Sequence, residues 1–396
     1  MLGVRVLVAP DTFGSILTAR EVAATVAAGW RDVAPADALD ECPLADGGPG
    51  FVDTLHAALG GRLLPVTVPG PLGEPTPATL LLVDEPAGRT AYVESAQAVG
   101  LPLVPEDRRD PGRTTTRGVG ALLVAARDAG ARRVVVGLGG SSTNDAGAGM
   151  LVGAGLEVPA GLLDAGGGAL GAVTAADLVG LRDLRARWRD VELVAATDVD
   201  VPLLGLTGAS AGFAPQKGAS PEQAQELERC LGSFAHAATT ALADELRPDL
   251  LAGSRPTSAA TRLTAAAGAG AAGGLGFGLA LLGARVVPGG PFVADRVRLD
   301  ERLAAADVVV TGEGRFDWQS LHGKVATEVA ARALRHGIPT VVLAGEVQVG
   351  RRELSAAGIT AAYAVGETPE EVRAALADPV ATLRARAARV ARTWSR

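Results

Sequence analysis

Apolar runs of strand length alternate with amphipathic stretches of helix length in the first and last parts of the chain. Residues 4–9, 307–311 and 340–344 are almost uninterrupted apolar segments, which are typical of parallel strands buried on both faces. The other elements predicted in these parts are helices over about 18–30, 300–305, 325–336 and from 369 onward, a strand at 361–364, and a strand and a helix within 41–59.

Helix-start signals support two of these helices. Thr18 is followed three residues later by Glu21, which is the capping-box pattern. Thr368 has Pro369 at the first helical position and Glu371 three residues on. Both helices are therefore expected to begin directly after a threonine N-cap.

The middle of the chain has a different character. Short strands are predicted at 62–68, 78–83 and 90–95, and the Pro- and Gly-rich turns between them indicate an antiparallel arrangement. Longer patterns then return, and they predict helices over 115–129 and 221–246 and strands over 133–138 and 192–197.

Strands that alternate with helices at this spacing predict an α/β fold built on a doubly wound parallel sheet. Because the two ends of the chain share the pattern and the middle does not, we predict a discontinuous Rossmann-like domain formed by residues 1–62 and 293–396. A second, inserted α/β domain is predicted for residues 63–292.

Composition excludes several classes of protein. Of 396 residues, 48% are hydrophobic and 20% charged, which argues against disorder, and the net charge of −7 argues against nucleic-acid binding. Cys42 and Cys230 form neither a disulfide framework nor a metal motif, so a cytoplasmic location is expected. Residues 1–10 resemble a strand, not a signal peptide.

The longest uncharged stretch covers residues 263–284, long enough to cross a bilayer. It contains seven glycines, four of them within 268–274. We therefore predict a Gly-rich turn leading into a buried helix, and no membrane span.

Two residue types are rare enough to be informative. Lysine occurs only as Lys217 and Lys324, against 35 arginines, and asparagine only as Asn144. In such an Arg-rich composition a remaining lysine marks a place where its compact charge matters, because arginine is not its equivalent.

A loop rich in glycine and hydroxyl residues follows the strand at 133–138 and opens a helix. Its glycines permit close backbone approach, and free helix N-terminal amides suit an anion. The alternative is a simple capped turn. The residues predicted to bind phosphate or substrate are Gly139, Gly140, Ser141, Thr143 and Asn144.

A G-x-G-x-x-G pattern occurs at Gly268, Gly270 and Gly273. It follows an Ala-rich stretch and no strand, so the dinucleotide fingerprint is disfavoured. A nucleotide-facing loop and a tight helix-packing turn both remain open.

Charged residues gather at the carboxyl end of the strand at 307–311. Glu313, Arg315, Asp317 and Lys324 lie within a dozen residues and are predicted to form a Mg²⁺ and phosphate site. A solvated turn with ion pairs is the alternative, and His322 is expected to be a structural hydrogen-bonding residue.

Other strand tips carry candidate residues of the same kind. Asp198 and Asp200 follow the strand at 192–197, where they could share a metal or accept a substrate proton. Lys217, beside a glycine, could neutralise phosphoryl charge or serve as a helix-entry residue. Asp11 and Asp46 are expected on the same sheet edge as Glu313, with ordinary Asp-initiated turns as an equal alternative.

These segments together resemble the bacterial glycerate kinase family of type I, the glycerate 2-kinases. The similarity covers nearly the full length, and the most specific motif is Gly-Glu-Gly-Arg-x-Asp-x-Gln-Ser-Leu-x-Gly-Lys within 312–324. The other matching stretches are 9–13, 43–48, 139–145, 197–204, 214–218 and 268–274.

The resemblance implies phosphorylation of D-glycerate to 2-phosphoglycerate with ATP and Mg²⁺, in a two-domain fold with the active site in the cleft between the domains. Four positions depart from the usual motifs of the family, namely Gly14, Pro49, Val201 and Glu346. Several of them lie in predicted site loops and bear on the identity of the substrate.

The working hypothesis is in-line phosphoryl transfer, in which the protein supplies positioning and electrostatics. Candidate metal ligands are Asp46, Asp200 and Glu313. Lys217, Lys324 and Arg315 would stabilise charge, and Asp198 would orient or deprotonate the hydroxyl. The alternatives are a kinase for another small hydroxy acid, a silent ligand-binding regulator and, less favoured, a dehydrogenase. The sequence leaves a monomer and a homodimer equally open.

Overall fold

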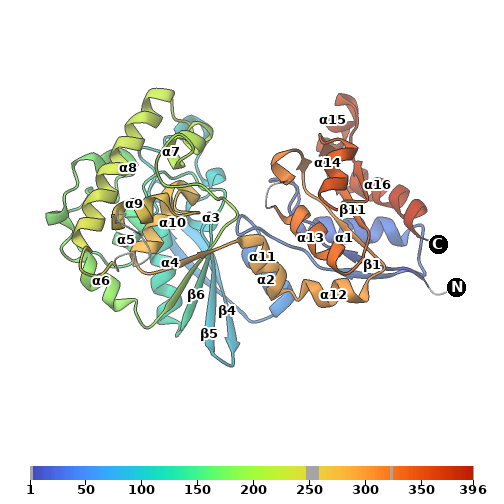
Figure 1. The fold of residues 1–396 in the computed structure, drawn as a ribbon, viewed down its shortest axis with the longest axis horizontal. Coiled ribbons are helices and arrows are strands. Elements are labelled where there is room, and N and C mark those ends of the chain that lie inside the picture. Colours follow the sequence, from blue (N-terminus) through green and yellow to red (C-terminus); the bar gives the residue numbers. More distant parts are fainter. Residues whose placement is uncertain (1–2, 247–257, 322–323, 396) are drawn as a thin grey trace, which may run out of the picture. The chain divides into compact units, whose positions relative to one another are not determined.

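The computed structural model describes residues 3–246, 258–321 and 324–395. The chain divides into two compact units, and each is described by itself (Figure 1). Unit 1 comprises Met1–Asp46, Asp53–Gly60 and Pro288–Arg396, and unit 2 comprises Gly47–Val52 and Gly61–Val287.

Unit 1 is built on a five-stranded sheet in which all neighbouring strands pair in parallel, in the order β13-β11-β9-β1-β2. Counted within this sheet alone, the order is 2-1-3-4-5, one of the two common doubly wound arrangements. The strands are β1 (Arg5–Val8), β2 (Ala38–Glu41), β9 (Val308–Thr311), β11 (Thr340–Ala344) and β13 (Ala361–Ala364). The predicted doubly wound parallel sheet is confirmed.

Successive residues of these strands contribute to two separate hydrophobic cores. Val8 and Val310 pack with residues of α1 and α16, whereas Val342 and Ala344 pack with residues of α13 and α14. The sheet is therefore covered by helices on both faces. The helices are α1 (Ala19–Arg31), α2 (Phe51–Leu59, which spans the unit boundary), α11 (Gly289–Arg296), α12 (Leu299–Ala305), α13 (Val325–Arg335), α14 (Arg351–Ala356), α15 (Pro369–Ala377) and α16 (Pro379–Trp394).

The predicted capping boxes are confirmed. Thr18 accepts a hydrogen bond from the backbone of Glu21, whose carboxylate accepts one from the backbone of Thr18. Thr368 and Glu371 make the same reciprocal pair at the start of α15. Local sequence thus sets the starts of two helices of unit 1.

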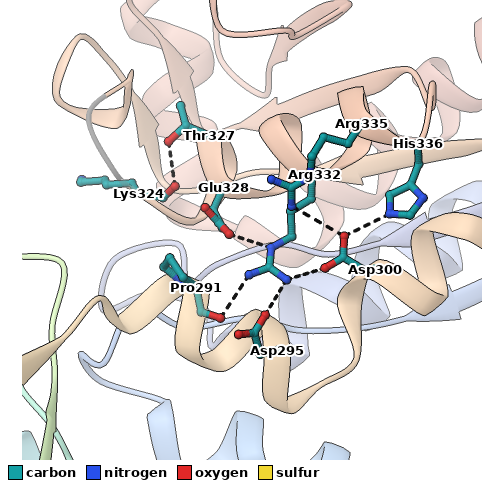
Figure 2. Close-up of polar contacts among 9 residues, drawn as sticks. All are labelled: Pro291, Asp295, Asp300, Lys324, Thr327, Glu328, Arg332, Arg335 and His336. Carbon is teal, nitrogen blue, oxygen red and sulfur yellow. Dashed lines mark hydrogen bonds and ion pairs between the residues drawn. The ribbon is translucent and has the colours of Figure 1, made fainter.

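A buried guanidinium joins three helices of unit 1 (Figure 2). Arg332 on α13 has a side chain only 7% exposed, and its nitrogens lie 2.6 Å from Glu328, 2.7 Å from Asp295 and 2.6 Å from Asp300. Asp295 belongs to α11 and Asp300 to α12. The network therefore fixes α13, the helix that Lys324 precedes.

Replacement of Arg332 by Met is expected to lower the free energy of unfolding by about 2 kcal/mol, because three carboxylates lose a shared buried cation while staying partly hydrated. Arg335→Met is the matched control, since this side chain is 64% exposed and lies 3.7 Å from Asp300. Urea unfolding of both variants measures the difference. Equal stability of the two would show that the network contributes nothing.

Unit 2 contains a six-stranded mixed sheet in the order β3-β4-β5-β6-β7-β8. The first three strands are antiparallel, as predicted, but β5 then pairs in parallel with β6, so the predicted antiparallel segment extends the parallel sheet. The strands are β3 (Arg62–Pro69), β4 (Pro75–Glu85), β5 (Gly88–Glu94), β6 (Arg133–Gly137), β7 (Glu192–Ala196) and β8 (Arg285–Val287).

The helices of unit 2 enclose one large hydrophobic core with this sheet. They are α3 (Ala96–Val99), α4 (Arg117–Asp128), α5 (Ala148–Gly153), α6 (Leu181–Arg187), α7 (Ala209–Phe213), α8 (Pro221–Ala241), α9 (Ala259–Ala265) and α10 (Ala271–Leu281). Ser220 caps α8 through the backbone N–H of Gln223, as expected.

The Gly-rich segment before β8 behaves as predicted. Ala272, Gly273 and Gly274 have positive φ, and the helical residues Leu275 to Leu281 that follow are almost all buried in the core of unit 2. Within the described ranges, the structure has no helix with the length and apolar character that a membrane crossing requires.

Candidate active site

The first group of polar residues lies at the carboxyl edge of the unit 1 sheet. The chain leaves β1 toward β2 on one side and returns at β9 on the other side of β1, so the strand order reverses between β1 and β9. Ligands of open α/β sheets bind at such a reversal. Asp11 follows β1 and Glu313 follows β9, and Asp11 N donates to Gly312 O at 2.8 Å.

Three carboxylates influence one another at this edge. Burial raises the pKa of Asp11 well above its usual range, and the charges of Asp46 and Glu313 raise it further. Burial also raises the pKa of Glu313, although Lys324 opposes this shift with its Nζ 3.5 Å from Glu313 Oε2. Burying several carboxylates of like charge together is unfavourable in free energy. A cation bound at this edge would offset that repulsion.

Carboxylate oxygens at this edge are donor atoms of the kind that Mg²⁺ prefers. Among the described residues, no three acidic, histidine or cysteine side chains form a ready metal cage. Glu313 Oε1 is buried and, within the described part of the chain, accepts no hydrogen bond. Since Mg²⁺ is commonly held by one or two carboxylates together with substrate phosphates and water, Asp46 and Glu313 suit a cation that arrives with a nucleotide.

Lys324 occupies the N-cap position of α13, and its carbonyl accepts a hydrogen bond from Thr327 Oγ1 at 2.8 Å. Figure 2 shows its side chain extending away from the Arg332 network. The ammonium group is therefore free of that network and is directed by its ion pair with Glu313.

Two other predicted residues of this motif have structural partners. Arg315 lies 3.4 Å from the carboxylate of Glu346, which joins the short strands β10 (Arg315–Phe316) and β12 (Glu346–Val347). Asp317 accepts hydrogen bonds from the backbone N–H groups of Gln319 and Ser320. The two side chains thus shape the loop, and His322 lies outside the described residues.

The second group of polar residues lies in unit 2, in the loop that follows β6. Ser142 Oγ donates to Val99 O at 2.9 Å, and Thr114 Oγ1 donates to Ser142 O at 2.9 Å. Leu101 N donates to Gly140 O, which has a positive φ. Contacts from two separate segments, 99–101 and the one with Thr114, therefore hold this loop in place.

Asp145 is the centre of this loop and is absent from the residues predicted to bind or react. Its carboxylate accepts four hydrogen bonds, from the N–H and hydroxyl of Thr116 and from the backbone of Gly147 and Gly149, at 2.8–3.2 Å. Asp145 is the last residue of the 139–145 motif, so the motif itself could have identified it as a candidate. Burial nevertheless raises its pKa.

Lys217 is buried beneath the same loop, with 3% exposure. Its Nζ donates to Ser141 Oγ at 2.9 Å and to Thr143 O at 2.6 Å. Burial lowers the pKa of this amine to about 7, against the opposing charge of Asp145. The group can therefore bind an anion and can also exchange a proton near neutral pH.

A pocket of about 290 Å³ opens at this lysine. Its wall includes Gly139, Gly140, Ser141, Phe213, Lys217 and Gly273. Thr143 Oγ1 and Asn144 Oδ1 are buried nearby in the chain and have no hydrogen-bond partner in the described part of the structure, while Asn144 Nδ2 donates to Ser210 Oγ at 3.0 Å. A buried ammonium beside hydroxyl and glycine backbone groups suits an anionic ligand.

The two remaining motifs of unit 2 pack against each other. A Cβ on Gly268 would approach Val286 and Thr197, and one on Gly270 would meet Pro202 O at 2.2 Å. A Cβ on Gly273 would meet Thr143 O at 1.9 Å. These glycines therefore permit close packing, and Gly273 also lines the pocket at Lys217, so a ligand-facing role for this loop stays a prediction.

The carboxylates of the β7 tip differ in surroundings. Asp198 is half-buried and Asp200 is exposed, and Val199 between them lines the pocket at Lys217. Asp200 belongs to unit 2, whereas the other two predicted metal ligands, Asp46 and Glu313, belong to unit 1.

Comparison with known proteins decides the family. Residues 6–395 match the sequence profile of the Glycerate kinase family. The chain belongs to the glycerate kinase family. It is 39% identical over 373 residues to the glycerate kinase of Bacillus subtilis, covering 93% of this chain and 92% of that protein. It is 37% identical over 369 residues to the glycerate 2-kinase of Escherichia coli, covering 91% and 90%.

A solved structure agrees with this assignment to the glycerate kinase family. A crystal structure from Salmonella typhimurium, assigned to glycerate kinase 2, aligns with a TM-score of 0.75 at 36% identity and 98% coverage of both chains. The resemblance predicted from the sequence motifs and the α/β fold class are confirmed. As a member of this family the chain is a kinase.

Proposed function

We propose that this kinase transfers the terminal phosphoryl group of ATP to the 2-hydroxyl of D-glycerate. The observation that carries the proposal is the group formed by Asp11, Glu313 and Lys324 at the point where the strand order of unit 1 reverses. Acidic groups and a lysine at a sheet edge match what nucleotide phosphates and their cation require. The glycerate kinases among the relatives support the acceptor.

In this proposal unit 1 receives the nucleotide phosphates. Asp46 and Glu313 would hold Mg²⁺, and this ion, when bound, neutralises phosphate charge. Lys324 donates to the transferred group and stabilises the charge that it carries in the transition state. Glu313 in turn keeps the ammonium of Lys324 oriented.

Unit 2 receives the acceptor in this proposal. Lys217 and Ser141 bind the carboxylate of glycerate, and the rigid loop around Asp145 keeps both in place. The 2-hydroxyl oxygen forms a bond to the terminal phosphorus while the bond from that phosphorus to the leaving oxygen of ADP breaks. Asp198 accepts the hydroxyl proton.

The test is ADP formation with a panel of acceptors, namely D-glycerate, L-glycerate and D-lactate, which lacks the second hydroxyl. We expect turnover with D-glycerate and its loss in Asp198→Asn. Turnover of another hydroxy acid without turnover of glycerate would favour the alternative of a kinase for a different small hydroxy acid. That alternative is motivated by Gly14, Pro49, Val201 and Glu346. ATP and glycerate binding without product would indicate a silent regulator.

A further inference from the structure

An apolar pocket lies in unit 1 beside the carboxylate group. Its walls come from the loop after β1 and from α15 and α16, two helices near the C-terminus of the chain (Figure 1). Its apolar lining includes Phe13, Leu17, Val365, Val372, Ala375 and Leu383. The hollow has about 80 Å³ of space that water can reach and about 500 Å³ once its open mouth is counted.

The floor of this pocket is continuous with the loops that carry Asp11 and Glu313. Gly345 N donates to Glu313 O at 3.2 Å, and Glu346 N donates to Gly314 O at 3.1 Å. Gly366 N donates to Gly345 O at 3.2 Å. A series of backbone hydrogen bonds thus links the loop after β9, which carries Glu313, to the loop after β13, which lines the apolar pocket.

Close packing keeps this hydrogen-bonded backbone rigid. A Cβ on Gly345 would meet Gly314 O at 2.3 Å, and one on Gly314 would meet the backbone of Phe13 and Gly14 at 3.2–3.3 Å. The pocket and the carboxylates therefore form one preformed surface, with an apolar end and a charged end.

We infer that the apolar pocket binds the adenine ring of ATP, an inference that rests on the proposed function. A nucleotide has the same division into a flat apolar ring and a charged chain. Apolar walls with few polar groups are typical of sites for such ring systems. The volume of the hollow suits a single ring system and is too small for a wide hydrophobic partner surface.

Glu346 gives the pocket a base preference. It is the one acidic residue among the described residues that line the pocket, and its carboxylate already accepts from Arg315 and Gln348. A carboxylate has about four acceptor positions, so it can also accept from the amino group of adenine. Guanine presents a carbonyl oxygen at that position, which the carboxylate repels.

The test is a substitution on α15 that reduces the volume of the pocket. Ala375→Leu adds bulk to the wall, and Ala374→Leu places the same change on an exposed neighbour outside the pocket. Calorimetry measures the binding of ADP and of inorganic tripolyphosphate, which has no base. We expect Ala375→Leu to weaken ADP at least ~10-fold, which is roughly 1.4 kcal/mol, while tripolyphosphate binding and the Ala374→Leu variant stay unchanged.

The outcomes separate this inference from the proposed function. Equal ADP affinity of the two variants would overturn the base pocket even if glycerate is phosphorylated. A selective loss in Ala375→Leu would support the pocket even if glycerate is not a substrate. If the chain self-associates, and if Ala375→Leu alone disrupts this association while ADP affinity stays unchanged, the pocket would instead bind a second copy of the chain. Equal affinity for ADP and GDP would contradict the role of Glu346.

Discussion

Replacement of Lys324 by Ala is expected to lower kcat by at least ~10²-fold, the range found when a preorganised charge-stabilising donor is removed. Lys324 lies 3.5 Å from a buried carboxylate of Glu313 and begins a helix that is anchored elsewhere by Arg332. The variant therefore loses a charge near the phosphates while the helix keeps its support. Steady-state kinetics with saturating ATP and acceptor measures the effect.

Two further variants distinguish a direct role of Lys324 from a structural one. Lys324→Arg keeps the positive charge and should recover part of kcat, although its planar group fits a site built for an ammonium less well. Arg335→Met removes an exposed cation from the same helix and should leave kcat unchanged. Near-normal turnover of Lys324→Ala would exclude the residue from the reaction.

Replacement of Lys217 by Met is expected to lower kcat/KM for the acceptor by roughly 10- to 10²-fold, because a charge-assisted hydrogen bond contributes about 1.5–3 kcal/mol. Ser141→Ala removes a neutral partner of Lys217 and should have a smaller effect in the same direction. Arg229→Met removes an exposed cation from α8 and serves as the control. An unchanged kcat/KM in Lys217→Met would contradict the anion site.

The pH dependence of stability gives a second measurement on the same variant. The pKa of Lys217 is lowered from 10.5 to about 7 in the folded protein, so the unfolded chain binds more protons between these two values. The free energy of unfolding should therefore rise with pH across this window in the wild type. Lys217→Met should lack this rise, and acceptor affinity in the wild type should fall as pH passes 7.

Much of the fold could be predicted because local patterns determine it. The apolar runs at β1, β9 and β11 and the threonine caps of α1 and α15 are short-range signals, and all appear in the structure. Strand pairing is a long-range property. The pattern of 62–95 indicated antiparallel strands but could not show that β5 pairs with β6.

The candidate site was predictable only in part for the same reason. The charged motif around Glu313 lies in one stretch, and the rarity of lysine drew attention to Lys217 and Lys324. Burial of Lys217 depends on a loop more than 70 residues away in the chain, so its lowered pKa could not be foreseen. The apolar pocket unites segments from both ends of the chain, and each segment alone is typical of ordinary core.

The glycines of 268–274 illustrate why spacing alone does not assign a role to a motif. Their spacing fits a nucleotide loop, yet each replaces a side chain that would collide with neighbouring residues. Gly273 also lines the pocket at Lys217, so one glycine can serve both packing and a ligand site.

Phosphorus NMR of the product formed from ATP and D-glycerate tests the central claim most directly. Phosphate on the 2-oxygen is attached to a carbon with one hydrogen, so the account predicts a new phosphorus resonance split into a doublet. Phosphate on the 3-oxygen is attached to a carbon with two hydrogens and would give a triplet. A triplet, or ADP formation without a new ester resonance, would contradict the account.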